Sequence, residues 1–393
     1  MDEFENPFSP GAGTPPPAFI GRDNLINSYR VALRRTMSGR PGKSIMPIGL
    51  RGVGKTVLLN RFYEMAQELD LSAAFIEAPE TGDFRPILAA RMRTILLELD
   101  RGSVSQAVKR ALGVLKSFSY NLPDGASISI DTDALAGSAD SGVMADDVTD
   151  LFVAAGEAGR DRGRAILLAI DEVQYLTGDE LGALISAVHR TAQLSLPVML
   201  VGAGLPQLPG LAGNAKSYAE RLFDFPELGS LDRDDAQTAL AVPVGAQGVE
   251  FSPDALDALF GYTKGYPYFL QEWGYHVWNA APKSPITLKD VEGAAAYVRS
   301  QLDNNFFRVR MDRLTPAEKD YLVAMAGLGA GPHRSGDIAA RLKVKVESVA
   351  PRRSALIKKG MLYSPAHGDT AFTVPMFDDF LRRAQSGSAG WDR

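Results

Sequence analysis

Residues 49–56 read GLRGVGKT and match the pattern G-x-x-x-x-G-K-[ST] in full. The apolar run over residues 45–50 predicts a buried strand, and residues 57–63 predict the first turns of a helix. Glycines let the backbone wrap closely around a phosphate, so that successive N–H groups and the helix N-terminus point at the anion. In this strand–loop–helix context the stretch predicts a phosphate-binding loop, and a glycine turn that merely precedes a lysine is the alternative.

The loop indicates a site for ATP or ADP with Mg²⁺. Lys55 would reach the β- and γ-phosphates, and the Thr56 hydroxyl would ligate the metal ion. The residues expected around the phosphates are Gly49, Gly52, Val53, Gly54, Lys55, Thr56 and Val57.

An acidic pair follows a second apolar run. Residues 165–172 read AILLAIDE, which is typical of a central parallel strand buried on both faces. The two acids stand at the carboxyl end of the strand, where open α/β sheets place ligands. Asp171 would hold Mg²⁺ through its water shell, and Glu172 would polarise the attacking water. A strand that only happens to end in acidic residues is the alternative, and the phosphate loop upstream favours the catalytic interpretation.

Bulk composition narrows the class of protein. With 393 residues the chain is long enough for two or three domains, and its 45% hydrophobic content is that of a globular protein. The net charge of −5 argues against a protein that coats nucleic acid over its whole surface. The absence of cysteine excludes disulfides and thiolate metal sites, and the four histidines are widely scattered. Lacking a signal peptide and an apolar run of membrane-spanning length, the chain is predicted to be cytoplasmic, without a membrane partner.

Other core elements are less specific. At the tip of the strand predicted over residues 197–202 the chain reads GAG, so the usual polar sensor of nucleotide state is missing. Arg221, just before a further strand, is a candidate arginine finger for a neighbour's γ-phosphate or its own, and an ordinary surface arginine is the alternative. Residues 102–144 read as an insertion without an assigned role. Within it we expect a helix over 104–115 and strand-like segments over 118–122 and 127–131.

Segments on either side of the core complete the expected nucleotide site. Residues 1–17 are rich in proline and predict a poorly ordered arm. The apolar plug and glycine that follow, Phe19, Ile20 and Gly21, could wall an adenine, although a plain helix cap is as consistent with them. Residues 232–311 are wholly helical and predict a lid, with the core domain spanning 18–231. Within the lid, Pro267 opens a helix at a position where its missing N–H costs nothing.

Residues 312–383 predict three helices and a β-hairpin, the pattern of a winged helix-turn-helix, followed by a tail over 384–393. The first helix begins with a capping box at Thr315 and Glu318. From 334 to 359 there are eight basic residues against two acidic ones, a net charge of +6. Double-stranded DNA is therefore the expected partner, and a module used only for protein contacts is the alternative. The candidate DNA-binding residues are Lys345, Ser348, Arg352, Arg353, Lys358 and Lys359.

Taken in order, these segments resemble a known group. The set comprises FIGRDN, GLRGVGKT, AILLAIDEVQYL, VMLVGAGLP, AERLFDFPEL, GYPYFLQ and the winged helix, over about residues 18–383. It is similar to bacterial and archaeal AAA-type ATPases related to the origin-recognition ATPases, and to the signalling (STAND) branch of P-loop NTPases. The resemblance implies an α/β fold in which helices sandwich a parallel sheet, with a helical lid and a C-terminal winged helix-turn-helix. It also places residues 19–22 beside adenine.

Two functions follow from the resemblance. Where replication initiators usually carry a sensor arginine, residues 265–267 read GYP, closer to the Gly-x-Pro signature of the STAND branch. This departure favours a slow, nucleotide-governed switch over fast turnover. The first interpretation is an ATPase whose nucleotide state controls a DNA-binding winged helix. The second is a STAND-like signalling or assembly ATPase, whose winged helix makes protein contacts for autoinhibition or for association with a partner or another copy.

Overall fold

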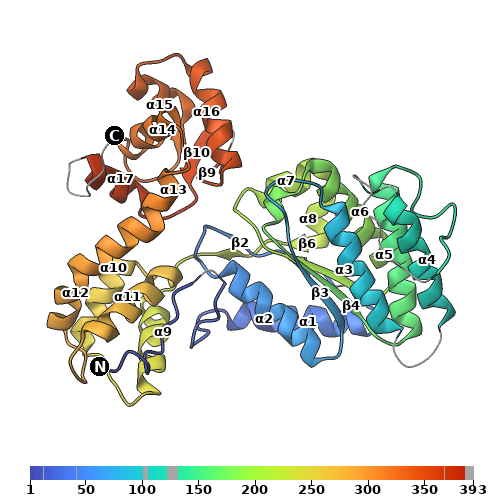
Figure 1. Ribbon diagram of the computed structural model, residues 1–393, viewed down its shortest axis with the longest axis horizontal. Helices are drawn as coiled ribbons and strands as arrows, with labels where there is room; N and C mark the ends of the chain where they lie inside the picture. The colour runs from blue at the N-terminus through green and yellow to red at the C-terminus, as the bar shows by residue number, and fades with distance from the viewer. Residues whose placement is uncertain are drawn as a thin grey trace. The chain divides into compact units, whose positions relative to one another are not determined.

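The computed structural model describes residues 1–11, 13–40, 42–100, 105–120, 122, 132–366 and 368–385. The chain forms two compact units (Figure 1). The core unit comprises residues 22–49 and 55–227. The helical unit comprises residues 1–21, 50–54 and 228–393, so that the phosphate-loop segment 50–54 groups with it.

A parallel sheet forms the centre of the core unit. β4 (Ile166–Asp171) lies between β3 (Ser72–Glu77) and β5 (Val198–Gly202), and both pairings are parallel. All six residues of β4 are buried, as its uninterrupted apolar sequence predicts. Because parallel strands end at the same edge of the sheet, the acidic end of β4 lies at the ligand-binding edge.

Two short strand pairs are separate from this three-stranded sheet. β1 (Ser44–Ile45) pairs in parallel with β6 (Phe223–Asp224), and β2 (Ile48–Gly49) pairs with β7 (Glu227–Leu228). A parallel bridge joins Ile48 to Gly204, just after β5. The segment that leads into the phosphate loop therefore lies next to the strand that neighbours β4.

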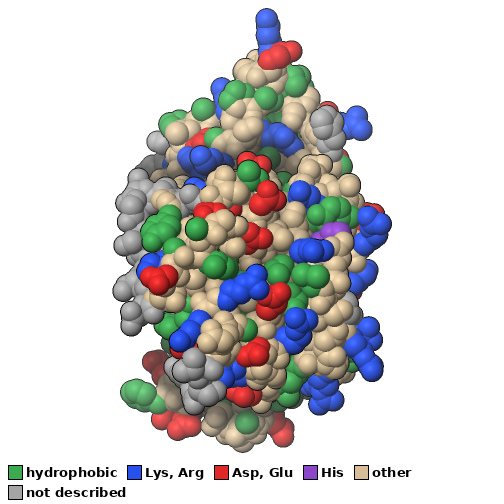
Figure 2. All heavy atoms as spheres, turned by 90° about the vertical axis from the view of Figure 1, so that its right-hand side faces the viewer, with side chains coloured by type: hydrophobic (Ala, Val, Ile, Leu, Met, Phe, Trp, Pro, Cys, Tyr) green, Lys and Arg blue, Asp and Glu red, His purple; other side chains and the backbone are tan. Residues whose placement is uncertain are grey.

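Helices cover both faces of this sheet (Figure 1). On one side, α1 packs on α2 through the stacked rings of Tyr29 and Phe62, whose centroids are 4.0 Å apart. On the other side, α3 to α6 contribute to one hydrophobic core with the strands. The side of the unit that carries α4 and α5 mixes basic and acidic side chains (Figure 2), as the modest net charge leads one to expect. The helices are α1 (Asp23–Met37), α2 (Lys55–Glu68), α3 (Arg85–Leu99), α4 (Gln106–Tyr120), α5 (Met144–Asp161), α6 (Gly178–Gln193), α7 (Leu208–Ala215) and α8 (Ala219–Leu222).

The expected insertion is more helical than its sequence suggests. The strand predicted over residues 118–122 is wrong, because α4 continues to Tyr120. Phe118 is buried together with Val114 and Leu115, four and three residues earlier, which is helical spacing. The alternation of apolar and polar residues after Ser117 is therefore the end of a helical stripe. The strand predicted over 127–131 lies outside the described residues.

The first part of the helical unit, which includes the segment predicted as a lid, consists of helices. Two of its helices begin at side-chain caps: the Asp232 carboxylate accepts from Asp235 N–H at 2.9 Å, and Thr287 forms a capping box with Asp290. The elements are α9 (Arg233–Gly245), α10 (Pro253–Thr263), α11 (Pro267–Ala280), α12 (Leu288–Gln301), the π-helix η3 (Leu302–Arg308) and α13 (Val309–Met311).

Among the described residues, the second part contains four helices and a small antiparallel sheet. The capping box predicted at Thr315 and Glu318 is confirmed, and the predicted hairpin pairs Ala371 with Tyr363. A third strand and a final helix escaped prediction: the strand is only two residues long, and the helix follows a turn at Met376 with a φ of 60°. The elements are α14 (Pro316–Ala326), β8 (His333–Arg334), α15 (Ser335–Leu342), α16 (Val346–Lys358), β9 (Leu362–Tyr363), β10 (Asp369–Phe372) and α17 (Phe377–Gln385).

The N-terminal arm is better ordered than its proline content predicts. Phe8 is only 2% exposed and fills a slot above Gly274 of α11, where a Cβ atom would lie 2.7 Å from its ring. Asn6 donates to Asn279 at 2.7 Å, and the indole of Trp278 donates to the carbonyl of Asp2 at 2.8 Å. One buried aromatic ring and these hydrogen bonds thus dock a segment whose composition alone indicates disorder.

Phe8→Ala is expected to release the arm without disturbing the rest of the chain. Loss of a buried phenyl ring removes about 3 kcal/mol of packing, so amide hydrogens of residues 1–9 should exchange roughly 100-fold faster. Phe4→Ala is the matched control, because Phe4 is 98% exposed. Equal exchange in the two variants would show that Phe8 does not hold the arm.

Candidate nucleotide site

The backbone of the phosphate loop adopts conformations that require glycine. Gly52 and Gly54 have φ angles of 86° and 90°, in the left-handed region that side chains disfavour. α2 begins at Lys55, whose side chain is only 6% exposed. The positive end of the helix dipole and a largely buried ammonium group thus meet where the loop ends, an arrangement suited to a polyphosphate.

The hydroxyl and the carboxylate predicted to ligate Mg²⁺ are brought together. Thr56 Oγ1 donates to Asp171 Oδ2 at 2.6 Å, joining the first turn of α2 to the end of β4. Burial raises the pKa of Asp171, while the bond from Thr56 and the charge of Lys55 act in the opposite direction. Hard oxygen donors of this kind are the ligands that Mg²⁺ prefers, so these residues fit the ion.

Glu172 leaves the strand in a sharp turn. Its φ of 52° and ψ of 38° are left-handed, and its N–H donates to Asp171 Oδ1 at 2.8 Å. Its carboxylate accepts a hydrogen bond from the side-chain amide of Gln174, whose own oxygen accepts from Leu205 N–H at 2.9 Å. Gln174 was missed at the sequence level. The sequence feature that could have indicated its role is an amide side chain two positions after Glu172, together with the absence of a polar side chain at residues 202–204.

Comparisons with known proteins concern the part of the chain that carries this site. Residues 18–201 match the model of the family described as AAA ATPase domain. The chain carries an AAA ATPase domain. Residues 304–381 match a family described as a domain of unknown function, DUF8462. A search of curated proteins found no match.

Solved structures resemble the chain at low identity. The Walker-type ATPase of Pyrococcus abyssi is 15% identical with a TM-score of 0.58, over 93% of this chain and 96% of that one. The RuvB Holliday junction branch migration motor of Thermotoga maritima is 17% identical with a TM-score of 0.47, over 93% and 95%. The Orc1 protein of Aeropyrum pernix, solved in complex with DNA, is 14% identical with a TM-score of 0.46, over 94% of each chain. At these identities the likeness to the first structure concerns the fold alone.

The described residues lack two features. No helix there is both long and apolar enough to span a bilayer. No group of three or more His, Asp or Glu side chains gathers there as a metal site.

Within the helical unit, the loop segment of the AAA ATPase domain is held by two other parts of the chain. The Tyr266 hydroxyl donates to the carbonyl of Arg51, and Tyr268 N–H donates to the carbonyl of Gly52 at 3.1 Å. Arg51 N–H donates to the carbonyl of Thr373, after β10, at 2.9 Å. A Cβ on Gly52 would lie 3.1 Å from both tyrosines, so glycine also allows this close approach. The start of α11 and the C-terminal module thus share the peptide groups of the loop.

A second arginine lies near this segment. Burial, followed by the charge of Arg51, lowers the pKa of Arg310 to about 10. The Arg310 guanidinium lies 4.0 Å from the centroid of the Phe306 ring. Sequence reasoning missed Arg310 because it follows the π-helix, far along the chain from the loop and outside every motif.

The residues expected near adenine come together only in part. Gly21, with a φ of 73°, packs against Leu231 and Asp235, where a Cβ would lie 2.5 Å from the Asp235 carboxylate. Gly265, two residues before Pro267, packs on the carbonyl of the same Leu231. The glycine of the FIGR segment and the Gly-x-Pro stretch therefore share one neighbour, while Phe19 and Ile20 are half-buried.

The role predicted for Arg221 as an arginine finger stays a prediction. Arg221 lies exposed on α8, and the contacts among the described side chains do not join it to Lys55, Thr56 or the acidic pair.

Two of the predicted DNA-binding side chains serve the C-terminal module itself. Arg353, a candidate DNA-binding residue on α16, donates to Thr370 Oγ1 at 2.8 Å, to Ser364 Oγ at 2.6 Å and to the carbonyl of Asp369 at 2.8 Å. Lys359 pairs with the capping-box carboxylate of Glu318 at 2.7 Å. The sequence shows that Arg353 and Lys359 are charged, but it does not show that each has a partner within the module.

The other members of that set remain at the surface. Ser348 is exposed and donates its hydroxyl to the carbonyl of Lys345 at 2.7 Å, within the first turn of α16. Lys345 and Lys358 are exposed and Arg352 is half-buried. Within the described part of the chain, these three side chains have no hydrogen-bond or ion-pair partner, so they are available to an outside anion.

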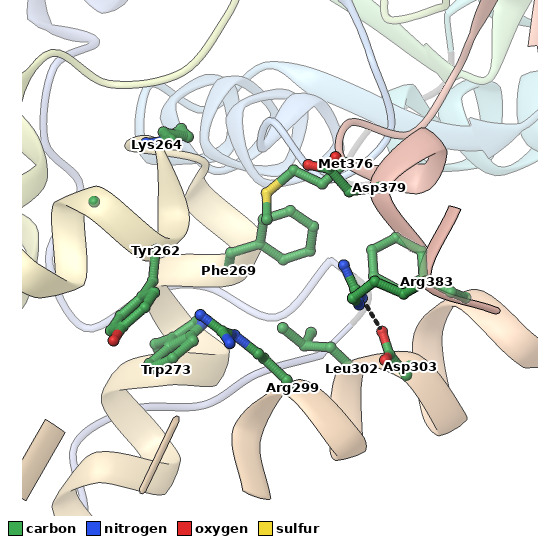
Figure 3. Close-up of a pocket in the computed structure, with 12 residues that line it drawn as sticks. Tyr262, Lys264, Phe269, Trp273, Arg299, Leu302, Asp303, Met376, Asp379 and Arg383 are labelled. Carbon is green, nitrogen blue, oxygen red and sulfur yellow. Dashed lines mark hydrogen bonds and ion pairs between the residues drawn. The ribbon is translucent and has the colours of Figure 1, made fainter. Parts of the chain in front are cut away.

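A pocket of about 300 Å³ lies elsewhere in the helical unit (Figure 3). Arg383 of α17 pairs with Asp303 of η3 at 2.6 Å. The Arg299 guanidinium lies 5.1 Å from the centroid of the Tyr262 ring, which stacks on Trp273 at 4.4 Å. The pocket lies where α17 meets the helices of the first part of this unit. Several of the side chains that line it already contact one another.

Proposed function

We propose that the chain binds ATP with Mg²⁺, hydrolyses it slowly, and uses its nucleotide state to control a C-terminal winged helix-turn-helix that binds double-stranded DNA. The observation that carries this proposal is the three-way hydrogen bonding of the loop. Peptide groups of Arg51 and Gly52 bond to Tyr266 and Tyr268 at the start of α11 and to Thr373 of the C-terminal module. A change in the loop on phosphate binding would therefore alter contacts with both.

Each residue of the site has a defined task in this mechanism. Lys55 attracts the β- and γ-phosphates into the loop. Thr56 and Asp171 would hold Mg²⁺, which would neutralise charge on the triphosphate. Glu172 orients the attacking water and accepts its proton. Slow turnover follows from the Gly-x-Pro stretch over residues 265–267, which is typical of switches.

Control of the module is a matter of differential binding. ATP shifts a conformational equilibrium only if it contacts one state better than the other. Since Arg51 N–H is engaged with Thr373, a nucleotide that repositions the loop changes the free energy of the docked module. If DNA binds the undocked module better, ATP would change the affinity for DNA, and DNA would change the affinity for ATP by the same factor.

The same contact supports the second candidate. A module held on the phosphate loop by Thr373 would also suit a STAND-like signalling or assembly ATPase, in which docking is autoinhibitory. Its winged helix would then bind protein or another copy of the chain, and Arg221 would act on a neighbour's nucleotide.

DNA binding measured with and without ATP separates the two candidates. Lys345→Glu/Arg352→Glu should weaken affinity at least about tenfold and reduce the slope of log Kd against log salt by about 2. Neither side chain has an internal partner among the described residues, so the fold should persist. Lys283→Glu/Lys289→Glu is the control, because it makes the same charge change on exposed lysines of the lid.

The outcomes are distinct. Wild-type binding that depends on nucleotide and is lost only in the α16 variant supports the DNA-binding ATPase. If the wild type binds no DNA at low salt with ATP, with ADP or without nucleotide, the proposal fails and the protein-contact module takes its place.

A further inference from the structure

Gln174 occupies the turn between the acidic pair and the neighbouring strand. It is the middle residue of the 3₁₀ helix η2 (Val173–Tyr175), which directly follows Glu172. Its amide nitrogen donates to Glu172 Oε2, and its oxygen accepts from Leu205 N–H at 2.9 Å. One side chain therefore connects the carboxylate expected to activate water with the loop after β5.

The backbone on both sides fixes this position. Val173 N–H donates to the carbonyl of Ala203 at 2.9 Å, which ties η2 to the loop after β5. A Cβ on Gly204 would lie 2.8 Å from the Gln174 oxygen, and one on Gly202 would lie 2.8 Å from Val173. The strand tip that lacks a polar side chain of its own thus leaves room for the amide of Gln174.

The hydrogen bond from Gln174 engages only one oxygen, Oε2, of the Glu172 carboxylate. The left-handed backbone at Glu172 turns the chain so that the two side chains meet. A hydrogen bond to an ionised acceptor is stronger than a neutral one, so it restricts the rotamers of the glutamate. Within the described ranges, Oε1 of Glu172 has no hydrogen-bond donor, which leaves it to a water molecule.

We infer that Gln174 is a positioning residue, which orients the Glu172 carboxylate toward the attacking water and links it to the loop after β5. This inference rests on the proposed ATP hydrolysis. It supplies, from the turn after β4, the polar group that is missing at the tip of β5.

A double-mutant cycle on the full-length chain tests the inference. Gln174→Leu should lower kcat for ATP about tenfold, the effect of losing one charge-assisted hydrogen bond, with KM nearly unchanged. In a Glu172→Gln background the same change should have no further effect on kcat, because Gln174 acts only through the carboxylate. Tyr175→Phe is the control in the same turn, since it removes the hydroxyl that donates to Glu80.

Each result decides the matter. A kcat unchanged or raised by Gln174→Leu, or lowered equally in both backgrounds, overturns the role of Gln174 while the proposed function stands. A wild type that binds ATP and never hydrolyses it overturns the proposed hydrolysis, and the role of Gln174 with it. ATP affinity and melting temperature, measured on every variant, distinguish a misoriented Glu172 from a protein that has unfolded or no longer binds ATP. A fall in kcat with both of these unchanged supports the inference.

Discussion

Lys55→Ala is expected to abolish ATP hydrolysis and to weaken ATP binding by about 100-fold or more. Lys55 is 6% exposed at the first position of α2, so little water screens its charge. Two or more phosphate oxygens would lose their nearest cation, and hydrogen bonds between charged groups contribute about 1.5–3 kcal/mol each. Isothermal titration calorimetry with ATP and ADP measures the loss.

A matched lysine controls for the change of charge. Lys43 forms a surface ion pair with Asp224 at 2.9 Å, in which both side chains are about half exposed. Lys43→Ala should leave ATP affinity within about twofold, because exposed pairs contribute little. If Lys55→Ala bound ATP as tightly as Lys43→Ala, the phosphate loop would not be the nucleotide site.

The parts of the site that the sequence predicts are those written in contiguous motifs. Glycines at 52 and 54 take the left-handed backbone that the loop requires, and the acids at 171 and 172 end a wholly buried strand. Thr56 and Asp171 stand 115 positions apart, yet meet at 2.6 Å because parallel strands share their carboxyl edge. Strand order is a strong constraint, and it makes this long-range contact predictable.

Other parts could not be predicted, because they depend on contacts between segments without a motif. Tyr266 reaches Arg51 across 215 positions, and Thr373 reaches it from beyond β10. Phe8 is buried against Gly274, where a side chain would leave no room for its ring, in a segment whose prolines otherwise indicate disorder. From the sequence, Arg353 cannot be told from a surface arginine, because its three hydrogen-bond acceptors lie in other segments of the module.

Glu172→Gln is expected to separate binding from hydrolysis. The substitution keeps the length and shape of the side chain and removes the carboxylate that accepts the proton of water. Loss of a general base lowers the rate about 100-fold or more, whereas the residues expected to hold the phosphates and Mg²⁺, Lys55, Thr56 and Asp171, are unchanged. ATP should therefore bind with wild-type affinity and persist unhydrolysed, as single-turnover kinetics with labelled ATP would show.

The trapped complex also reports on the switch. If ATP itself, and not its hydrolysis, alters the contacts of Arg51 with Thr373, the Glu172→Gln protein with ATP should show the DNA affinity of the ATP-bound wild type for hours. Glu220→Gln, an exposed glutamate on α8, is the control and should turn over normally. Hydrolysis at the wild-type rate in Glu172→Gln would assign water activation to another residue. DNA affinity that follows hydrolysis would show that the product state, with ADP bound, moves the module.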